Sequence, residues 1–270
     1  MKLTLYQDQA VYRNNSGLGN FLHTTPSLQY IAQKRKKPIR VYTSLEYLKE
    51  ALRDAPFIDW VGKDLPKGSD FVYEPEYDRT CHLWDYQFSW KNLTGRPWSD
   101  YNDQFYPYID RPQLDSPPKK NFVILLNGGA GGNSAFSASK KMTPQMLSSI
   151  FTHVQALGMD LIFCGTEVDY EITNKIHPDT SKYCKPCLGN IREVLGLINL
   201  ASGVIANDTG LYHAACAMKK RVLVSTRVPV RSNGRPSVCI RNLNPHTEFV
   251  EEYNWDATTQ AFLKRLKNKK

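Results

Sequence analysis

The sequence predicts an α/β protein of two Rossmann-like, doubly wound domains that face one another across a cleft. Short apolar runs, which are typical of buried strands, alternate with segments of helical periodicity in both halves of the chain. Several of these runs lead directly into glycine-rich or polar turns. Because parallel strands end at the same edge of their sheet, such turns indicate a ligand-binding crevice.

The N-terminal half has the pattern of a βαβ unit. Leu28, Ile31 and Ala32 recur at the spacing of one helical face, and Pro26 suits the first turn of that helix. The expected elements are a strand at 3–6, a glycine turn at 17–20, a helix at about 25–36, a strand at 39–42, a helix at 45–53 and a short strand around 60–61.

The C-terminal half predicts a doubly wound parallel sheet, because its strands and helices alternate. The expected elements are a strand at 122–126, a helix at about 144–157, a strand at 161–164, helices near 169–176 and 191–201, a strand at 204–206, a helix from 211 and a strand at 222–225.

Two segments between residues 83 and 120 differ in composition from the rest of the chain. Aromatic and polar residues mix from 83 to 108, and core packing is the default expectation for them. A helix between the domains and a mobile surface that grips the substrate are the alternatives. Prolines and charges from 111 to 120 predict a linker. We therefore expect an N-terminal Rossmann-like domain at 1–118 and a C-terminal Rossmann-like domain at 119–270.

The charge balance predicts an anionic partner or simply favours solubility. Thirty-five Lys and Arg against 26 Asp and Glu give a net charge of +9, which attracts polyanions. Part of this surplus lies at 264–270, which we expect to be a frayed tail. No apolar run approaches eighteen residues, so no membrane span is expected, and the first residues do not form a signal peptide. We expect a cytoplasmic protein.

The six cysteines predict no disulfide framework, because several lie within apolar runs. Cys184 and Cys187 have the spacing of half a zinc site or of a redox pair. No second pair completes such a site, so a structural loop is the expectation.

The turn at Asn207–His213 is the most informative segment. It follows an apolar strand and leads into a helix of small residues. The backbone N–H groups at a helix start attract anions, and Thr209 and Gly210 let a ligand approach closely. His213 lies one turn further and is able to face the same ligand. The segment therefore predicts a cradle for nucleotide phosphates.

A glycine-rich loop follows another strand of the same half. Gly128 and Gly129 begin a run of four glycines that allows the backbone to wrap around an anion. Lys140 or Lys141 could neutralise the charge of that anion. The segment is not a P-loop, because Gly-Lys-Ser/Thr does not occur.

Two weaker turns complete the set. Gly17 and Gly19 stand where a strand leads into a helix, as a ligand-binding loop or only as a tight turn. Glu167 and Asp169 form an acidic turn that could bind a ribose hydroxyl or cap a helix.

Together these segments resemble glycosyltransferase family 9, the group of the ADP-heptose:lipopolysaccharide heptosyltransferases, which have the two-domain GT-B fold. Residues 17–26 look like the family's opening Gly-x-Gly-Asp segment with its later proline, and 57–61 look like its proline-isoleucine-aspartate strand. Residues 207–215 match its Asn-Asp-Thr-Gly-x-x-His-x-Ala signature.

The resemblance implies a protein of a bacterium or of a phage-infected bacterial host, with an acceptor-side domain at 1–118 and a donor-binding domain at 119–270. The family uses a nucleotide-diphosphate sugar as co-substrate, inverts the anomeric centre and requires neither a metal nor a cofactor, in keeping with the absence of an Asp-x-Asp motif. In this sequence Asp208, Thr209, Gly210 and His213 would hold the donor diphosphate and its sugar, Lys140 or Lys141 would be the phosphate lysine, and Glu167 or Asp169 would lie near the nucleoside.

One departure from the family concerns its presumed general base. The family's aspartate is Asn20 here, and a carboxamide cannot accept the proton of the acceptor hydroxyl. His23 is the nearest alternative base, although a packing histidine is the more ordinary role for it. Asp85, Asp100 and Asp103 are further candidates if the aromatic segment folds over the cleft.

We therefore expect a glycosyltransferase that acts on a hydroxyl of an anionic polymer. The positive charge, the short acceptor half and the aromatic segment favour a hydroxylated base in DNA, as in phage enzymes. The family's commonest role favours the lipopolysaccharide core or another surface glycan. A nucleotide-sugar-binding module without catalysis is a third hypothesis, because of Asn20.

Overall fold

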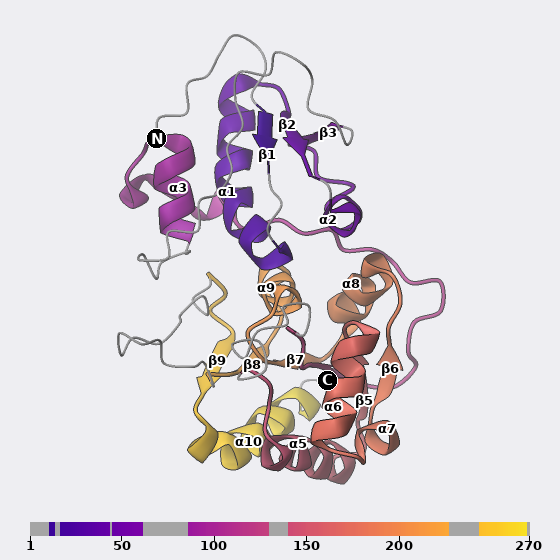
Figure 1. The fold of residues 1–270 in the computed structure, drawn as a ribbon. Coiled ribbons are helices and arrows are strands. Elements are labelled where there is room, and N and C mark those ends of the chain that lie inside the picture. The colour runs from indigo at the N-terminus through magenta and orange to yellow at the C-terminus, as the bar shows by residue number, and fades with distance from the viewer. Residues whose placement is uncertain are drawn as a thin grey trace. The chain divides into compact units, whose positions relative to one another are not determined.

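The computed structural model describes residues 11–13, 17–43, 45–61, 86–129, 140–226 and 243–268. The chain divides into two compact units, Met1–Asp110 with Arg241–Leu243 and Arg111–Ile240 with Asn244–Lys270. Both units have the α/β architecture that the sequence predicts, and each is described by itself (Figure 1).

In the described part of the N-terminal unit, three parallel strands form one sheet in the order β1-β2-β3. The strands are β1 (Val11–Arg13), β2 (Ile39–Tyr42) and β3 (Ile58–Val61), and the helices that follow β1 and β2 are α1 (Leu18–Arg35) and α2 (Glu46–Ala51). The sequence did not predict β1. The strand expected at 3–6 lies outside the described residues.

Helix α1 begins at Leu18, so the expected turn at 17–20 and the expected start near 25 are wrong. Pro26 lies inside the helix, where its ring nitrogen has no hydrogen to donate to the carbonyl of Leu22. The hydroxyl of Thr25 donates to that carbonyl instead, at 2.9 Å. A side-chain donor thus replaces the missing backbone donor, and the helix continues through the proline.

The aromatic segment packs into the N-terminal unit, which confirms the default expectation for its described part. It forms α3 (Tyr86–Thr94) and two short 3₁₀ turns, η1 (Trp98–Asp100) and η2 (Asp103–Phe105). Trp90 is fully buried, and its ring centroid lies 5.1 Å from that of Tyr30 on α1 and 5.9 Å from that of Phe105. Its indole N–H donates to the carbonyl of Pro97 at 3.1 Å.

In the described part of the C-terminal unit, six parallel strands form a doubly wound sheet in the order β6-β5-β4-β7-β8-β9. We refer to it as the C-terminal sheet. The strands are β4 (Phe122–Leu126), β5 (Asp160–Cys164), β6 (Lys185–Cys187), β7 (Gly203–Ala206), β8 (Val222–Ser225) and β9 (Thr247–Val250). The central strands are buried throughout, as strands covered on both faces must be.

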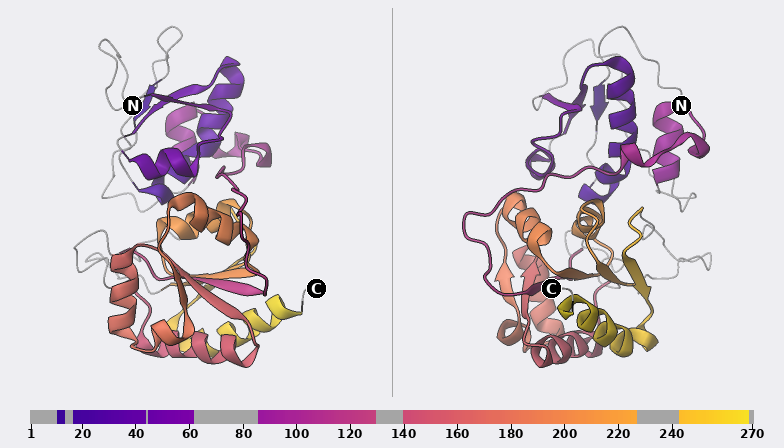
Figure 2. Two further views of the ribbon diagram at one scale, coloured as in Figure 1. Left: turned by 90° about the vertical axis from the view of Figure 1, so that its right-hand side faces the viewer. Right: turned by 180° about the vertical axis from the view of Figure 1, so that it is seen from behind.

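Helices cover both faces of the C-terminal sheet. They are α5 (Pro144–Ala156), α6 (Glu167–Ile176), α7 (Thr180–Tyr183), α8 (Ile191–Leu200), α9 (Gly210–Ala217) and α10 (Trp255–Lys267), with the 3₁₀ turn η3 (Glu252–Asn254) before α10. Figure 2 shows α5 and α10 on one face and α8 and α9 on the other. Val123, Leu125 and Ile205 point into the core shared with α5 and α10.

Two expectations for the C-terminal half are wrong. Cys184–Cys187 is no loop, because its last three residues form the edge strand β6, where a proline costs no ladder hydrogen bond. The tail expected at 264–270 is helical to Lys267, because Phe262, Leu263 and Leu266 are buried. The segment at 111–120, which we expected to be a linker, forms no helix or strand and directly follows the boundary between the units. It also packs on α8, where a Cβ on Gly196 would come within 2.5 Å of Leu114.

The described residues also show what the chain does not form there. Cys164, Cys184, Cys187 and Cys216 are thiols, so the described part contains no disulfide. Within the same residues, no group of His, Cys, Asp or Glu side chains is suited to hold a metal. None of the described helices combines the length and the hydropathy needed to cross a bilayer.

Candidate functional site

The candidate site lies at the carboxyl ends of β4 and β7, where the strand order of the C-terminal sheet reverses. From β4 the chain proceeds to β5 and β6 on one side, and then returns to β7 on the other side. Ligands of doubly wound sheets bind in the crevice at such a switch point. Three of the segments selected from the sequence follow strands that end here. They are the loops that begin at Asn127, Gly165 and Asn207.

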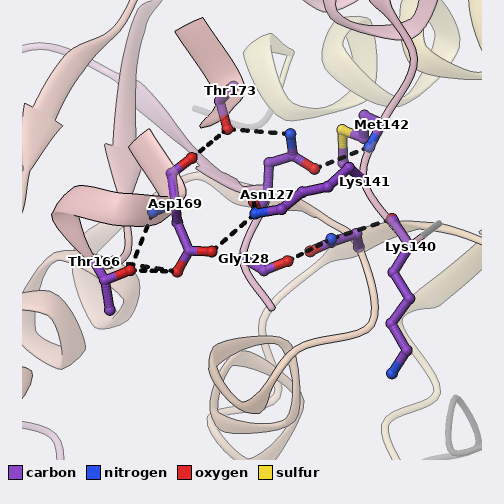
Figure 3. A network of polar contacts seen from close by, with 9 residues as sticks. Asn127, Gly128, Lys140, Lys141, Met142, Thr166, Asp169 and Thr173 are labelled. Atoms are coloured by element: carbon purple, nitrogen blue, oxygen red, sulfur yellow. Dashed lines mark hydrogen bonds and ion pairs between the residues drawn. The ribbon is translucent and has the colours of Figure 1, made fainter. Parts of the chain in front are cut away.

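Lys141 joins the loop after β4 to the start of α6 (Figure 3). Its ammonium donates to the carbonyl of Asn127 and, at 2.8 Å, to Oδ1 of Asp169. Both side chains of this ion pair are buried, at 4% and 8% exposed. Burial lowers the pKa of Lys141, and the carboxylate of Asp169 opposes that shift. A lysine enclosed in this way supports the loop from inside the fold.

Asp169 also caps α6. Its Oδ2 accepts the backbone N–H of Thr166 at 3.4 Å, and the Thr166 hydroxyl accepts the backbone N–H of Asp169 at 3.1 Å. These bonds form a capping box. The helix cap, which the sequence left as the alternative to ribose binding, is therefore present. Glu167 lies exposed in the first turn of the same helix.

Two asparagine side chains brace the loops against each other. The Asn127 amide accepts the N–H of Met142 at 2.9 Å and donates to the hydroxyl of Thr173 at 3.2 Å. The Asn207 amide donates to the carbonyls of Gly128 and Lys140, at 2.9 and 3.2 Å. Sequence reasoning assigned no role to either asparagine. The available signal was that each one directly follows a buried strand.

Gly128 lies where the three loops meet. A Cβ at this position would come 3.1 Å from Cγ2 of Thr209 and 3.6 Å from Oδ2 of Asp169. Gly129 has φ +102°, a conformation that side chains disfavour. The glycines therefore permit close approach of the loops, in addition to the approach of a ligand that the sequence suggested.

Helix α9 begins at Gly210 and directs its N-terminus to this edge of the sheet. Thr209 is its N-cap, and its hydroxyl accepts the N–H of Tyr212 at 3.4 Å. The first N–H groups of a helix, here those of Gly210 and Leu211, have no partner within the helix. Together with the positive end of the helix dipole they form an anion-binding surface.

Asp208 holds two basic side chains beside this helix start. Nζ of Lys140 lies 2.6 Å from its Oδ2, and Nε2 of His213 lies 3.8 Å from its Oδ1. Burial raises the pKa of Asp208, but His213 and Lys140 outweigh that effect and bring it to about 2. The side chain of Lys140 is 18% exposed, against 4% for Lys141. Lys140 is therefore the better placed of the two lysines to meet a ligand.

The residues selected in the N-terminal unit lie on α1. Gly17 is its N-cap and Gly19 and Asn20 lie in its first turn, so the glycine pair starts a helix instead of forming a loop. Asn20 is half-buried. His23 is fully buried, and its ring meets that of Tyr86 edge-on at 4.7 Å, as a packing histidine does.

The alternative carboxylates do not gather around Asn20 in the described residues. Asp100 pairs with Arg96 at 2.7 Å, and Asp103 is exposed in η2. Asp85 lies outside the described residues. The cleft between the two domains stays a prediction.

Residues 132–224 match the model of glycosyltransferase family 9 (heptosyltransferase). The resemblance to family 9 is confirmed. No curated protein matches the chain in a sequence comparison. The matched range contains Lys140, Lys141, Asp169 and the whole of the Asn207–His213 turn, so the family match and the switch-point geometry concern the same loops.

Solved structures share the fold of this chain at low sequence identity. A family 9 glycosyltransferase from Veillonella parvula is 14% identical with a TM-score of 0.67, over 97% of this chain and 98% of that one. The ADP-heptose lipopolysaccharide heptosyltransferase II of E. coli is 11% identical with a TM-score of 0.60, over 96% and 98%. Heptosyltransferase WaaC of E. coli, with ADP-2-deoxy-2-fluoro heptose, is 10% identical with a TM-score of 0.61, over 95% and 99%. The architecture is therefore of the GT-B type.

Proposed function

We propose that this protein is a glycosyltransferase that moves a sugar, most simply an ADP-linked heptose, to a hydroxyl of the lipopolysaccharide core or a related surface glycan. The observation that carries the proposal is the pairing of Lys140 and His213 on Asp208 beside the N-terminus of α9, at the switch point of the C-terminal sheet. These residues lie within the range that matches family 9.

The donor diphosphate would lie against the start of α9. The N–H groups of Gly210 and Leu211 and the ammonium of Lys140 would bind its oxygens. When the bond between the anomeric carbon and the diphosphate breaks, negative charge builds up on the leaving group. The same donors stabilise that charge without reorganisation, which lowers the barrier. Asp208, itself anionic, suits the task of positioning Lys140 and His213.

The acceptor hydroxyl would attack the anomeric carbon from the side opposite the diphosphate, so that the configuration inverts. The hydroxyl proton must pass to a base, and the Asn20 carboxamide is not one. Full burial against Tyr86 argues against His23 in this role. We therefore propose that a base other than these two accepts the proton, and we include no metal in the reaction.

The distribution of charge favours a glycan over DNA as the acceptor. Residues 1–110 contain 14 Lys and Arg against 14 Asp and Glu, whereas residues 111–270 contain 21 against 12. The half that receives the acceptor in family 9 thus carries no surplus of positive charge. Nothing in the comparisons supports DNA, and the similar heptosyltransferases favour the glycan.

Calorimetric titration of ADP tests the donor site. We expect the wild type to bind ADP and Lys140→Ala to bind it at least about tenfold more weakly, the usual cost of one charged hydrogen bond. Lys175→Ala removes an exposed charge on α6 and is the matched control, with unchanged affinity expected. Equal affinity of all three proteins would place the donor elsewhere.

Transfer assays test the acceptor and the chemistry. ADP-heptose is supplied with heptose-deficient lipopolysaccharide or with hydroxymethylated duplex DNA, and each reaction is run with and without a chelator. The proposal expects transfer to the glycan alone, unaffected by the chelator, with inverted configuration by NMR. Transfer to DNA alone would reverse the acceptor assignment. Donor binding without transfer to either acceptor would favour the binding-module hypothesis.

A further inference from the structure

A basic pocket lies at the amino ends of the strands of the C-terminal sheet, whereas the proposed donor site lies at their carboxyl ends. It has a volume of about 400 Å³ and is formed largely by the segments that precede β7 and β8. The donor loops instead follow β4, β5 and β7. The two sites thus lie at opposite ends of the strands of one unit. The residues on which the argument depends are Arg111, Asn199, Ser202, Lys219, Lys220 and Arg221.

Four cationic side chains share this pocket without a lining carboxylate. Arg111, Lys219, Lys220 and Arg221 contribute to its wall, and none of the described residues that line it is acidic. The pKa of Lys220 is lowered, first by burial and second by the charge of Arg111. The cluster is therefore electrostatically costly as it stands, and an entering anion would relieve that cost.

The ends of α8 and α9 account for only part of this charge. Helix C-termini attract cations, and the ammonium of Lys220 donates to the carbonyl of Asn199 near the end of α8, at 2.9 Å. Lys220 is therefore already engaged. In the described part of the chain, the guanidinium groups of Arg111 and Arg221 have no hydrogen bond or ion pair. Two guanidinium forks are well suited to phosphate oxygens.

We propose that this pocket binds a phosphate group carried by a small organic ligand, at a site separate from the donor. Arg111 and Arg221 would bind the phosphate oxygens, and the Ser202 hydroxyl and the Asn199 amide offer further hydrogen bonds. A volume of about 400 Å³ lies in the range of small-molecule sites and exceeds what a bare phosphate needs. The whole positive surplus lies in residues 111–270, which draws anions to this half of the chain.

Hydrogen exchange with inorganic phosphate as the probe tests the site. Wild type saturated with ADP is titrated with phosphate at constant ionic strength, and protection is followed at 199–202 and 219–222. We expect Arg111→Ala/Arg221→Ala to weaken this protection at least about tenfold. The control Lys175→Ala/Lys182→Ala removes two exposed charges from α6 and α7 and should leave it unchanged. Unaltered ADP affinity in both double variants would show that they remain folded.

The source of the phosphate is distinguished by flotation with phosphatidylcholine vesicles that contain or lack phosphatidic acid. Binding of the wild type, but not of Arg111→Ala/Arg221→Ala, to phosphatidic acid vesicles identifies a headgroup. Phosphate protection without vesicle binding identifies a free organic phosphate. Absence of protection in the wild type, or equal loss in the variant and the control, would overturn the proposal. If the double variant is unstable, the single variant Arg111→Ala replaces it in both experiments, because Arg111 is exposed.

Discussion

Different kinds of contact stabilise the interior of each unit. In the N-terminal unit, Trp90 packs against Tyr30, Tyr101 and Phe105, and aromatic rings fill the space between α1 and the segment from α3 to η2. In the C-terminal unit, an apolar sheet ends in buried polar side chains, with Lys141 and Asp169 at their centre. Apolar packing fixes elements, whereas directional polar bonds fix loops. The donor site that we propose lies in the unit whose loops are fixed in this way.

Loss of the Trp90 ring is the strongest test of the independence of the two units. Trp90→Ala should destabilise the N-terminal unit by about 4 kcal/mol, as is usual when a buried tryptophan is truncated. Because the residues that we propose for the donor site all lie in the C-terminal unit, ADP affinity should persist. Urea unfolding with hydrogen exchange, read separately for 17–110 and 111–268, measures the first effect, and calorimetry measures the second. A parallel loss of ADP affinity would mean that the units are coupled.

Loss of the Lys141 ion pair should destabilise the C-terminal unit. Lys141→Met leaves the buried carboxylate of Asp169 without its cation, at a cost of about 3 kcal/mol. Lys140→Met is the matched variant, because the side chain of Lys140 is more exposed and pairs with Asp208. Lys140→Met should lower the free energy of unfolding by less than Lys141→Met does, and it should weaken ADP binding by more. Similar urea midpoints for the two variants would contradict the difference drawn between these lysines.

The acid stability of the C-terminal unit should depend on Asp208. Its pKa is lowered from 3.8 to about 2 in the fold, so its contribution is complete above about pH 4 and is lost as the pH falls towards 2. Asp208→Asn should lose about 2 kcal/mol at pH 7 relative to the wild type. This difference should shrink towards zero near pH 2, as followed by urea unfolding across that range. A stability difference between the two proteins that does not change with pH would contradict the lowered pKa of Asp208.

The smallest effect is expected at Asn20. No acidic residue occupies the first turn of α1, so Asn20→Asp should stabilise the N-terminal unit by about 0.5 kcal/mol through the helix dipole. It also introduces the carboxylate that the resemblance of residues 17–26 to family 9 leads us to expect at this position. Melting temperature and transfer rate against pH measure the two effects, with Asn20→Ala as the control. A lower melting temperature than that of the control would show that the carboxylate does not face the helix start.

The sequence predicted the C-terminal unit better than the N-terminal unit, for physical reasons. Buried parallel strands such as β4 and β7 are continuous apolar runs, and the turns after them are visible as polar breaks. The start of α1 was misplaced because glycines and Pro26 ordinarily end or begin a helix, and the hydroxyl of Thr25 that compensates for the proline carries no sequence signal. The short strands β1 and β6 lacked an apolar run long enough to detect.

The candidate site was predicted as a set of residues but not as an arrangement. Lys140 and Lys141 are adjacent and chemically identical, and only the fold shows that one is enclosed with Asp169 and the other lies beside Asp208. Asn127 and Asn207 stand in the selected loops, but their side chains were given no role, because the sequence shows that each follows a buried strand and not which groups its amide bonds.

The Lys140–Asp208 pair has a consequence for selectivity. In the structure the ammonium of Lys140 is already neutralised by a carboxylate that stays ionised down to about pH 2. A ligand must therefore compete with Asp208 for this lysine. Under the proposed function, a singly charged anion would gain little from that exchange, whereas a diphosphate would interact with Lys140 and with the start of α9 at once. The pair would thus favour a diphosphate over monovalent anions.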